Sequence, residues 1–243
     1  MKFGKIIGVG NTASVYEWEE GKVVKLFNQE YPDDAVENEY YNAMLIRDMD
    51  FTKPKAYEVI SIEGRKGIIY DKVEGESLQD WAIRTRDVQQ CASYMAKLHK
   101  TIIQNNISNA ADYKDFLKQH IPHALLTADE QKNLLQMIDK LPDGNTLCHG
   151  DFHPGNIIMS GENTYIIDFM NICHGDYLYD IARTVFLVEY TPVPAETKDR
   201  GIILALKKSL ADSYLMHMNV TREMIQDYLT IISAVRKGEC PDE

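Results

Sequence analysis

The sequence predicts an α+β protein in which an antiparallel β-region with one helix precedes a mainly α-helical region. Two short stretches, 13–27 and 56–73, read as β-hairpins because apolar and alternating runs flank a polar turn. From residue 77 onward, apolar residues mostly recur with the 3.6-residue period of helices. We therefore expect a two-lobed chain, with an N-terminal lobe over 1–74 and a C-terminal lobe over 75–243.

The elements of the N-terminal lobe follow one another in a simple order. Residues 3–10 form an apolar strand that enters a glycine turn, and the 13–27 hairpin follows. A helix is expected over about 34–49, since Asp33 and its neighbour suit a helix N-terminus. The 56–73 hairpin completes a predicted five-stranded antiparallel sheet.

The C-terminal lobe is predicted to be helical except for one island. Helical periodicity marks the segments 77–86, 87–103 and 130–141, and helices resume at about 177–190, 196–217 and 221–237. The island begins with CHGDFHPGN and continues as the strand IIMS, the turn GEN and the strand TYIID. We expect a small hairpin at about 157–168 inside this lobe.

Composition narrows the class of protein. A chain of 243 residues with 44% hydrophobic residues is large enough for two lobes with a core. Its net charge of −11 argues against nucleic acid as a partner. The four cysteines form no CxxC pair, which indicates reduced thiols and predicts a cytoplasmic protein. Neither an apolar run of about 18 residues nor a signal peptide is evident, so no membrane partner is expected.

The polar island carries the residue types of a phosphoryl-transfer site. Asp151 and Asn156 share a loop stiffened by Pro154, and Asp168 follows at the end of an apolar strand. A hairpin between them would bring the three polar groups to one end. One carboxylate can then accept a proton from a hydroxyl, while the other carboxylate and the amide oxygen can hold Mg²⁺.

The string HGDFHPGN followed by IIDF resembles the catalytic loop and metal-binding Asp of the aminoglycoside phosphotransferase and choline kinase family, which has the protein-kinase-like fold. The resemblance implies that Asp151 is the catalytic base and that Asn156 and Asp168 are metal ligands. His149 matches a leading His with a structural role. The run GDYLYDIA is also similar to the family, and there Asp180 would brace the loop through its backbone amides.

The N-terminal stretch GVGNTASVY contains the pattern G-x-G-x-x-A, which is weak alone. In a dinucleotide-binding unit it would open a helix, but residues 14–20 alternate and favour strand–turn–strand, the context of a phosphate-covering loop in kinases. The third glycine of the protein-kinase pattern is Ala13 here. The candidate phosphate contacts are Gly8, Gly10, Asn11, Thr12 and Ser14.

The resemblance also implies a phosphate-binding Lys on the strand after this turn. Lys25 is the candidate because it is a charge inside the apolar run VVKLF, whereas Lys22 lies in a polar turn. An acid on the following helix should hold it. Glu39 is preferred to Glu37 because it shares a helix face with apolar residues. The backbone at Asp71 and Val73 is expected to meet the adenine of the nucleotide.

Together these residues predict an ATP- and Mg²⁺-dependent small-molecule kinase, which transfers the γ-phosphoryl group to a hydroxyl acceptor. GTP is left open as the donor. Two alternatives are a protein kinase and a nucleotide-binding pseudoenzyme that acts as a scaffold. The first is disfavoured because no A-P-E segment follows Asp168, and the second because every expected catalytic residue is present.

The acceptor is predicted less sharply. An aminoglycoside-like or choline-like amino alcohol is favoured, because several acids follow the predicted metal site and carboxylates attract cations. A neutral sugar or nucleoside and a zwitterion remain alternatives. The acids in question are Asp176, Asp180, Glu189, Asp212, Glu223 and Asp227.

Overall fold

The computed structural model describes residues 4–240, so residues 1–3 and 241–243, at the outer ends of the two expected lobes, lie outside it. The chain divides into two compact units. The first unit contains the residues up to Ser77 together with Ile157–Asn171, and the second contains Leu78–Asn156 and the residues from Ile172 onward. The lobe boundary between residues 74 and 75 stays a prediction.

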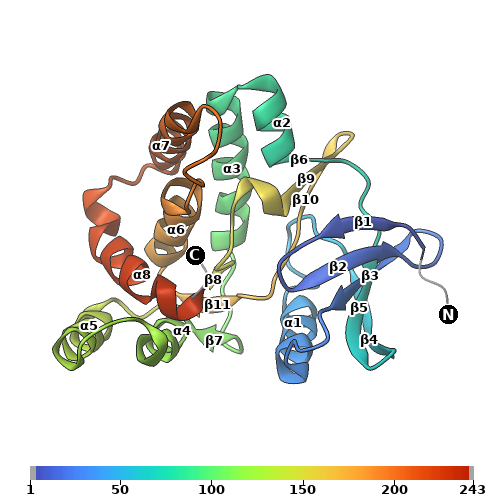
Figure 1. Ribbon diagram of the computed structural model, residues 1–243, viewed down its shortest axis with the longest axis horizontal. Coiled ribbons are helices and arrows are strands. Elements are labelled where there is room, and N and C mark those ends of the chain that lie inside the picture. Colours follow the sequence, from blue (N-terminus) through green and yellow to red (C-terminus); the bar gives the residue numbers. More distant parts are fainter. Residues whose placement is uncertain (1–3, 241–243) are drawn as a thin grey trace. The chain divides into compact units, whose positions relative to one another are not determined.

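The first unit is built on a five-stranded sheet, which confirms the prediction of an antiparallel N-terminal sheet (Figure 1). The strands pair antiparallel in the order β1-β2-β3-β5-β4. The turn between β4 and β5 has positive φ angles at Glu63 and Gly64, as the favoured two-residue hairpin turns require. The strands are β1 (Ile6–Val9), β2 (Ala13–Glu17), β3 (Lys22–Phe27), β4 (Ala56–Ile62) and β5 (Arg65–Asp71).

One helix, α1 (Asp33–Leu45), packs against β4 and β5. Its buried Val36 and Ala43 join Phe27 and Ile68 of the sheet in a hydrophobic core. The helix ends at Leu45 rather than at about residue 49, because the chain beyond it forms tighter turns in which the N–H groups of Arg47 and Met49 bond carbonyls three residues back. The acidic first turn expected from the sequence is present.

The expected 157–168 hairpin is formed by β9 (Ile157–Ser160) and β10 (Asn163–Ile166). The pattern places it in the helical lobe, whereas in the structure it groups with the first unit. The reason is a third strand, β6 (Glu76–Ser77), which pairs antiparallel with β9. The sheet β10-β9-β6 therefore ties the segment that carries Asp168 to the first unit.

Gly75, just before β6, is required by close approach of two backbones. A Cβ placed there would lie 2.2 Å from the carbonyl oxygen of Met159. We expect Gly75→Ala to lower the free energy of unfolding by about 1–3 kcal/mol, the usual effect of overpacking. Gly201 in the helix α7 (Arg200–Met218) is the matched control, since a Cβ there meets nothing within 4 Å and Ala should be neutral or stabilise by up to about 1 kcal/mol. Urea denaturation of both variants would test this, and equal stabilities would contradict it.

The second unit is mainly helical, as predicted, and α3 packs along α7 while α6 packs against α8 (Figure 1). Helix α4 was not anticipated from periodicity. Helix α7 begins at Arg200 rather than at 196, because Asp199 has a left-handed φ of 59° that interrupts a helix. The helices are α2 (Leu78–Thr85), α3 (Val88–Ile103), α4 (Tyr113–His120), α5 (Ala128–Lys140), α6 (Tyr177–Val185), α7 (Arg200–Met218) and α8 (Gln226–Glu239).

A small sheet in the second unit leads into the HGDFHPGN segment, which we call the 149–156 loop. Its strands β7 (Ala111–Asp112), β8 (Thr146–Cys148) and β11 (Cys173–Gly175) pair in the order β7-β11-β8. The loop follows β8 directly. Strands of two or three residues are too short for periodicity to reveal, so this sheet was not predicted.

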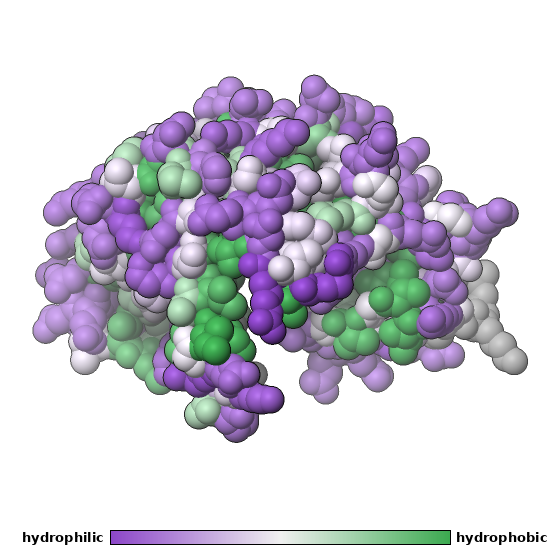
Figure 2. Space-filling view, turned by 90° about the horizontal axis from the view of Figure 1, so that it is seen from above, coloured by the Kyte–Doolittle hydropathy of each residue, from purple (hydrophilic) through white to green (hydrophobic). Residues whose placement is uncertain are grey.

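The displayed surface agrees with the charged composition. Hydrophilic residues predominate on the face seen in Figure 2, with smaller hydrophobic patches among them. None of the helices within residues 4–240 combines the length and the apolar character needed to cross a membrane.

Candidate active site

The glycine turn has the strand–turn–strand geometry expected from the sequence. Strand β1 carries Gly8, and the chain returns as β2 with the N–H of Gly10 donating to the carbonyl of Ala13 at 2.9 Å. The turn is held from outside by Asn28, whose side-chain amide donates to the carbonyl of Asn11 and whose backbone N–H donates to that of Thr12, both at 2.9 Å.

The fold itself does not require glycine at either candidate position. A Cβ on Gly8 would lie 3.6 Å from the Cβ of Val15, and one on Gly10 would lie 3.5 Å from the carbonyl of Ala13, which are ordinary contacts. Among the described residues, the glycines with positive φ are Gly21, Gly64, Gly150 and Gly161, so backbone conformation does not explain Gly8 and Gly10 either. The fold therefore does not account for the choice of glycine at these two positions.

Lys25 on β3 is held by two carboxylates within the first unit. Its ammonium donates to both oxygens of Glu39, at 2.9 and 3.0 Å, and to Oδ1 of Asp168 at 2.9 Å. Glu39 is 1% exposed and also accepts from the hydroxyl of Tyr70 at 3.0 Å. Lys22, the alternative, pairs with Glu19 at the exposed turn. The structure therefore brings together three residues chosen from distant parts of the sequence.

The charges of this cluster depend on one another. Burial lowers the pKa of Lys25, but the carboxylates of Glu39 and Asp168 outweigh burial and raise it overall, so the ammonium stays protonated. Burial is the main cause that raises the pKa of Glu39, with Asp168 adding to it and Lys25 opposing it. The two carboxylates hold the Lys25 ammonium in a fixed position, where it is a compact hydrogen-bond donor. The Asp168 side chain beside it is partly exposed.

Asp168 lies two residues beyond β10 in an unusual backbone conformation. Its φ is +66°, in the left-handed region that residues other than Gly seldom adopt. The chain after it is fixed by Asn42 of α1, whose amide donates to the carbonyls of Phe169 and Met170 at 3.2 and 3.0 Å. Asn42 was not anticipated from the sequence, although its spacing of three residues from Glu39 on a buried helix face is a usable signal.

The two residues expected to contact adenine, Asp71 and Val73, differ in the hydrogen bonds of their backbone groups. The N–H of Asp71 donates to the carbonyl of Lys55 at 3.0 Å, and its carboxylate accepts from Lys55 N–H and from the hydroxyl of Tyr57. Asp71 is thus partly occupied in joining β5 to the chain before β4. For Val73, no backbone hydrogen bond is found among the described residues. Of the two expected adenine contacts, Val73 is therefore the one whose backbone groups have no partner within residues 4–240.

In the second unit, the 149–156 loop holds Asp151 and Asn156 together. The amide nitrogen of Asn156 donates to the backbone carbonyl of Asp151 at 2.9 Å and to its carboxylate Oδ2 at 3.1 Å. Within the described chain, both of these side-chain bonds use the nitrogen, so the amide oxygen of Asn156 is left for another partner. Pro154 begins the 3₁₀ turn that places Asn156.

Asp180 on α6 binds the start of this loop. Its fully buried carboxylate accepts from the N–H of His149 at 2.7 Å and of Gly150 at 2.9 Å. It also contacts Nε2 of the buried His99 at 2.8 Å, and Nδ1 of His99 contacts the hydroxyl of Tyr214. Burial raises the pKa of Asp180, but His99 and the loop groups outweigh this and lower it overall. His99 was missed because a lone buried His carries no pattern.

We expect Asp180→Asn to be strongly destabilising. The Asp180 carboxylate has two acceptor oxygens, which bind two backbone N–H groups and His99. The Asn side chain has one acceptor oxygen, so at least one of these buried groups would lose its partner. The free energy of unfolding should fall by about 3–5 kcal/mol, the range for breaking a buried charged contact. Urea unfolding followed by tryptophan fluorescence measures this. The exposed Asp227→Asn on α8 is the control and should change stability by less than about 1 kcal/mol; similar losses for both would refute the brace.

The acids that suggested a cationic acceptor mostly have partners. Asp176 accepts from the N–H of Leu178 as the N-cap of α6, and Asp180 is committed to the loop. Two more of the six, Glu189 and Asp212, share Arg222. Little unbalanced negative charge therefore remains at these four positions.

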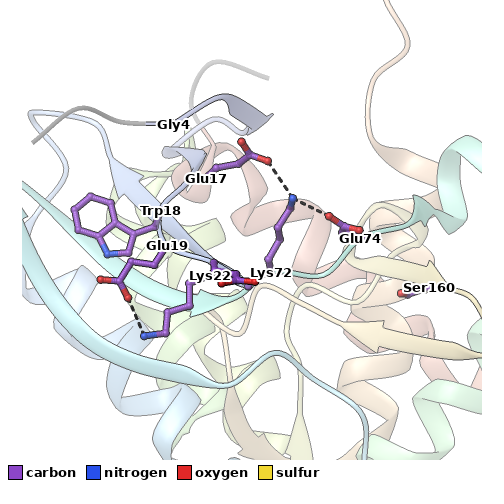
Figure 3. Close-up of a pocket in the computed structure, with 10 residues that line it drawn as sticks. Gly4, Glu17, Trp18, Glu19, Lys22, Lys72, Glu74 and Ser160 are labelled. Carbon is purple, nitrogen blue, oxygen red and sulfur yellow. Dashed lines mark hydrogen bonds and ion pairs between the residues drawn. The ribbon is translucent and has the colours of Figure 1, made fainter.

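One pocket of the first unit is lined by none of the predicted site residues, although Lys72 in its wall lies between Asp71 and Val73. It is an open depression of about 720 Å³ beside the β2–β3 turn of the first unit (Figure 3). Lys72 bridges Glu17 and Glu74 across it at 3.0 and 2.7 Å, and Lys22 pairs with Glu19. Its lining carries more carboxylates than lysines, which does not suit a phosphate chain, so the candidate site rests instead on the two clusters described above.

An antiparallel sheet with one helix, a mainly helical second unit and a polar loop after β8 define the protein-kinase-like fold. Residues 4–207 match the phosphotransferase enzyme family. The chain belongs to this family of kinase-type enzymes.

Individual proteins agree with this assignment. The chain is 24% identical over 199 residues to a protein LicA homolog of Mycoplasma capricolum subsp. capricolum, covering 80% of this chain and 76% of the relative. It has the fold of aminoglycoside phosphotransferase APH(3'')-Id from Streptomyces rimosus, solved with ADP and streptomycin, at 14% identity and a TM-score of 0.62, covering 91% and 90% of the chains. A choline/ethanolamine kinase family protein from Mesorhizobium loti has 11% identity and a TM-score of 0.59, covering 100% and 82%.

Proposed function

We propose that the protein is an ATP- and Mg²⁺-dependent kinase that phosphorylates a hydroxyl group of a small molecule. The observation that carries the proposal is the ammonium of Lys25, held by Glu39 and Asp168 at 2.9 Å. A buried, oriented cation next to a partly exposed carboxylate suits a phosphate chain and its metal ion. Membership of the phosphotransferase enzyme family supports the same reaction.

The donor groups of the two proposed metal ligands, a carboxylate and an amide oxygen, suit a magnesium ion. Mg²⁺ prefers oxygen ligands and keeps waters and phosphate oxygens, so one or two protein ligands suffice. Asp168 offers a carboxylate whose side chain is 35% exposed, and Asn156 offers the amide oxygen that its bonds to Asp151 leave unused. When bound, the ion would neutralise charge on the phosphate oxygens.

The chain's own groups would divide the remaining work. The bare backbone at Gly8 and Gly10 would approach the phosphates, with Asn11, Thr12 and Ser14 beside it, and Lys25 would donate to phosphate oxygens. Asp151 would orient the acceptor hydroxyl and take its proton as the new bond forms. Asn156 fixes the Asp151 carboxylate through its amide nitrogen, while His149 and Asp180 hold the loop.

The nucleotide would be ATP, with its adenine edge read by backbone groups at Val73 and Asp71. The free backbone of Val73 supports this placement. The ADP in the complex of the Streptomyces rimosus aminoglycoside phosphotransferase supports nucleotide use in a protein of the same fold. Discrimination between ATP and GTP stays a prediction to be measured by nucleotide competition.

The acceptor is proposed to be an amino alcohol, either choline-like or aminoglycoside-like. Support comes from the streptomycin complex and from the choline/ethanolamine kinase family protein, which share the fold. Charge in the second unit supports it less, because Arg222 already pairs with Glu189 and Asp212. A neutral sugar or nucleoside is therefore part of any acceptor screen, as is a zwitterion such as homoserine.

The test is a screen of amines, sugars and antibiotics in the presence of Mg²⁺ and a non-hydrolysable ATP analogue. A true acceptor should raise the melting temperature by mass action. Compounds that do so are then assayed for ADP release with ATP. A protein that binds nucleotide but forms no ADP with any of the compounds would favour a scaffold. ADP formation that occurs only with protein substrates would favour a protein kinase.

A further inference from the structure

We propose that Arg183 is a positioning residue for the 149–156 loop, and that Glu239 near the end of α8 holds Arg183 in place. The proposal deepens the proposed function, because it concerns the loop that carries the candidate base Asp151. Neither residue belongs to the polar island or to the run GDYLYDIA that suggested Asp180.

Arg183 and Glu239 form an ion pair that also holds the carbonyl of Gly150, and we call this pair the clamp. The Nε–H of Arg183 donates to the carbonyl of Gly150 at 2.9 Å. The rest of the guanidinium grips the Glu239 carboxylate, with Nη1 donating to Oε2 at 2.7 Å and Nη2 to Oε1. The cation also lies 5.4 Å from the ring centre of Phe116 on α4. One planar group thus links α6, α8 and the loop.

Both charges of the clamp are buried, so each depends on the other. The Arg183 side chain is fully buried and that of Glu239 is 11% exposed. Burial raises the pKa of Glu239, but Arg183, with help from Arg236, lowers it overall and keeps the carboxylate ionised. A bidentate pair with a third donor bond uses the fixed fork of Arg, which Lys cannot reproduce.

The clamp acts on the peptide group that leads into Asp151. Gly150 has a φ of +74° and is held from both sides by α6, through Asp180 at its N–H and through Arg183 at its carbonyl. The two helix residues are three positions apart and therefore lie on one face. The Gly150 carbonyl lies in the same peptide plane as the N–H and the Cα of Asp151. By holding this carbonyl, Arg183 fixes the orientation of the plane and so the direction of the Asp151 side chain.

Arg183→Lys tests this link, since it retains the charge and loses the fork. We expect kcat to fall by about 10- to 100-fold, as displacement of a catalytic group by about 1 Å does, with a smaller change in the KM for ATP. Most of the proposed nucleotide contacts lie in the first unit and are not touched, whereas Asn156 lies in the loop and can move with it. Amide hydrogen exchange of the peptide containing residues 148–156 should become faster, while exchange elsewhere in the second unit stays the same.

Arg222→Lys is the matched control, because Arg222 is likewise an Arg of this unit paired with carboxylates, and among the described residues its hydrogen bonds go to Glu189 and Asp212 and not to the loop. Should Arg183→Lys fail to fold, Glu239→Gln replaces it, since it loosens the guanidinium and retains Arg183. Unchanged kcat and loop exchange, or equal changes in the control, would overturn the proposal. A wild-type protein that phosphorylates nothing would overturn the proposed function instead, while the exchange comparison still decides whether Arg183 fixes the loop.

Discussion

Replacing Asp151 by Asn is expected to lower kcat by about 10²- to 10⁴-fold, the usual contribution of a general base. An amide cannot take the proton of the acceptor hydroxyl. It can still accept the bond that the Asn156 amide now makes to Oδ2, at 3.1 Å, so the loop should keep its shape. Steady-state kinetics would show the loss in kcat, and calorimetry should find unchanged affinity for Mg²⁺-ATP.

Asp176→Asn is the matched control for this variant. Asp176 is another Asp of the second unit, but its role is to cap α6 through the N–H of Leu178, which Asn also does well. Its kcat should equal that of the wild type. A kcat for Asp151→Asn within the scatter of this control would mean that Asp151 is not the base.

Asp168→Ala is expected to remove Mg²⁺-dependent nucleotide binding while leaving the fold intact. Loss of a residue that only hydrogen-bonds to a metal ligand usually lowers metal affinity by about 10- to 100-fold. Loss of the ligand Asp168 itself should therefore lower the affinity for Mg²⁺-ATP by more than this. The first unit should survive because Lys25 keeps both of its bonds to Glu39, so no buried charge is orphaned. Isothermal calorimetry with and without Mg²⁺ measures the effect.

The control is Asp48→Ala, a carboxylate of the first unit that is 88% exposed and pairs with its neighbour Arg47. It should bind Mg²⁺-ATP as the wild type does. If Asp168→Ala binds equally well, Asp168 holds no metal, and its contact with Lys25 would be purely structural.

Several elements were accessible from sequence because their signals are local. The hairpins of the first unit follow from alternation around Gly turns, and the sheet confirms them. The preference for Glu39 over Glu37 came from one inward helix face, and the structure places Glu39 against Lys25 and Glu37 against Lys66 at the surface. Such features could be predicted because the residues that form them are two to four positions apart in the sequence and share one face of a strand or helix.

What the sequence did not reveal depends on contacts between distant segments. β6 has two residues and exists because it pairs with β9. Asn42 bonds carbonyls more than 120 positions away, and Arg183 meets Glu239 at the far end of the chain. Such partners leave no periodicity, and helix ends like that of α1 are likewise decided by the turns that follow.

The measurement that tests the central claim most directly is the fate of labelled phosphate. The protein is incubated with γ-labelled ATP, Mg²⁺ and the compounds that stabilise it, and the label is then followed into small molecules, protein and free phosphate. The account predicts a small-molecule phosphate monoester that forms with the wild type and is nearly abolished in Asp151→Asn. Label that appears only on protein, or no transfer by a protein that binds Mg²⁺-ATP, would contradict it.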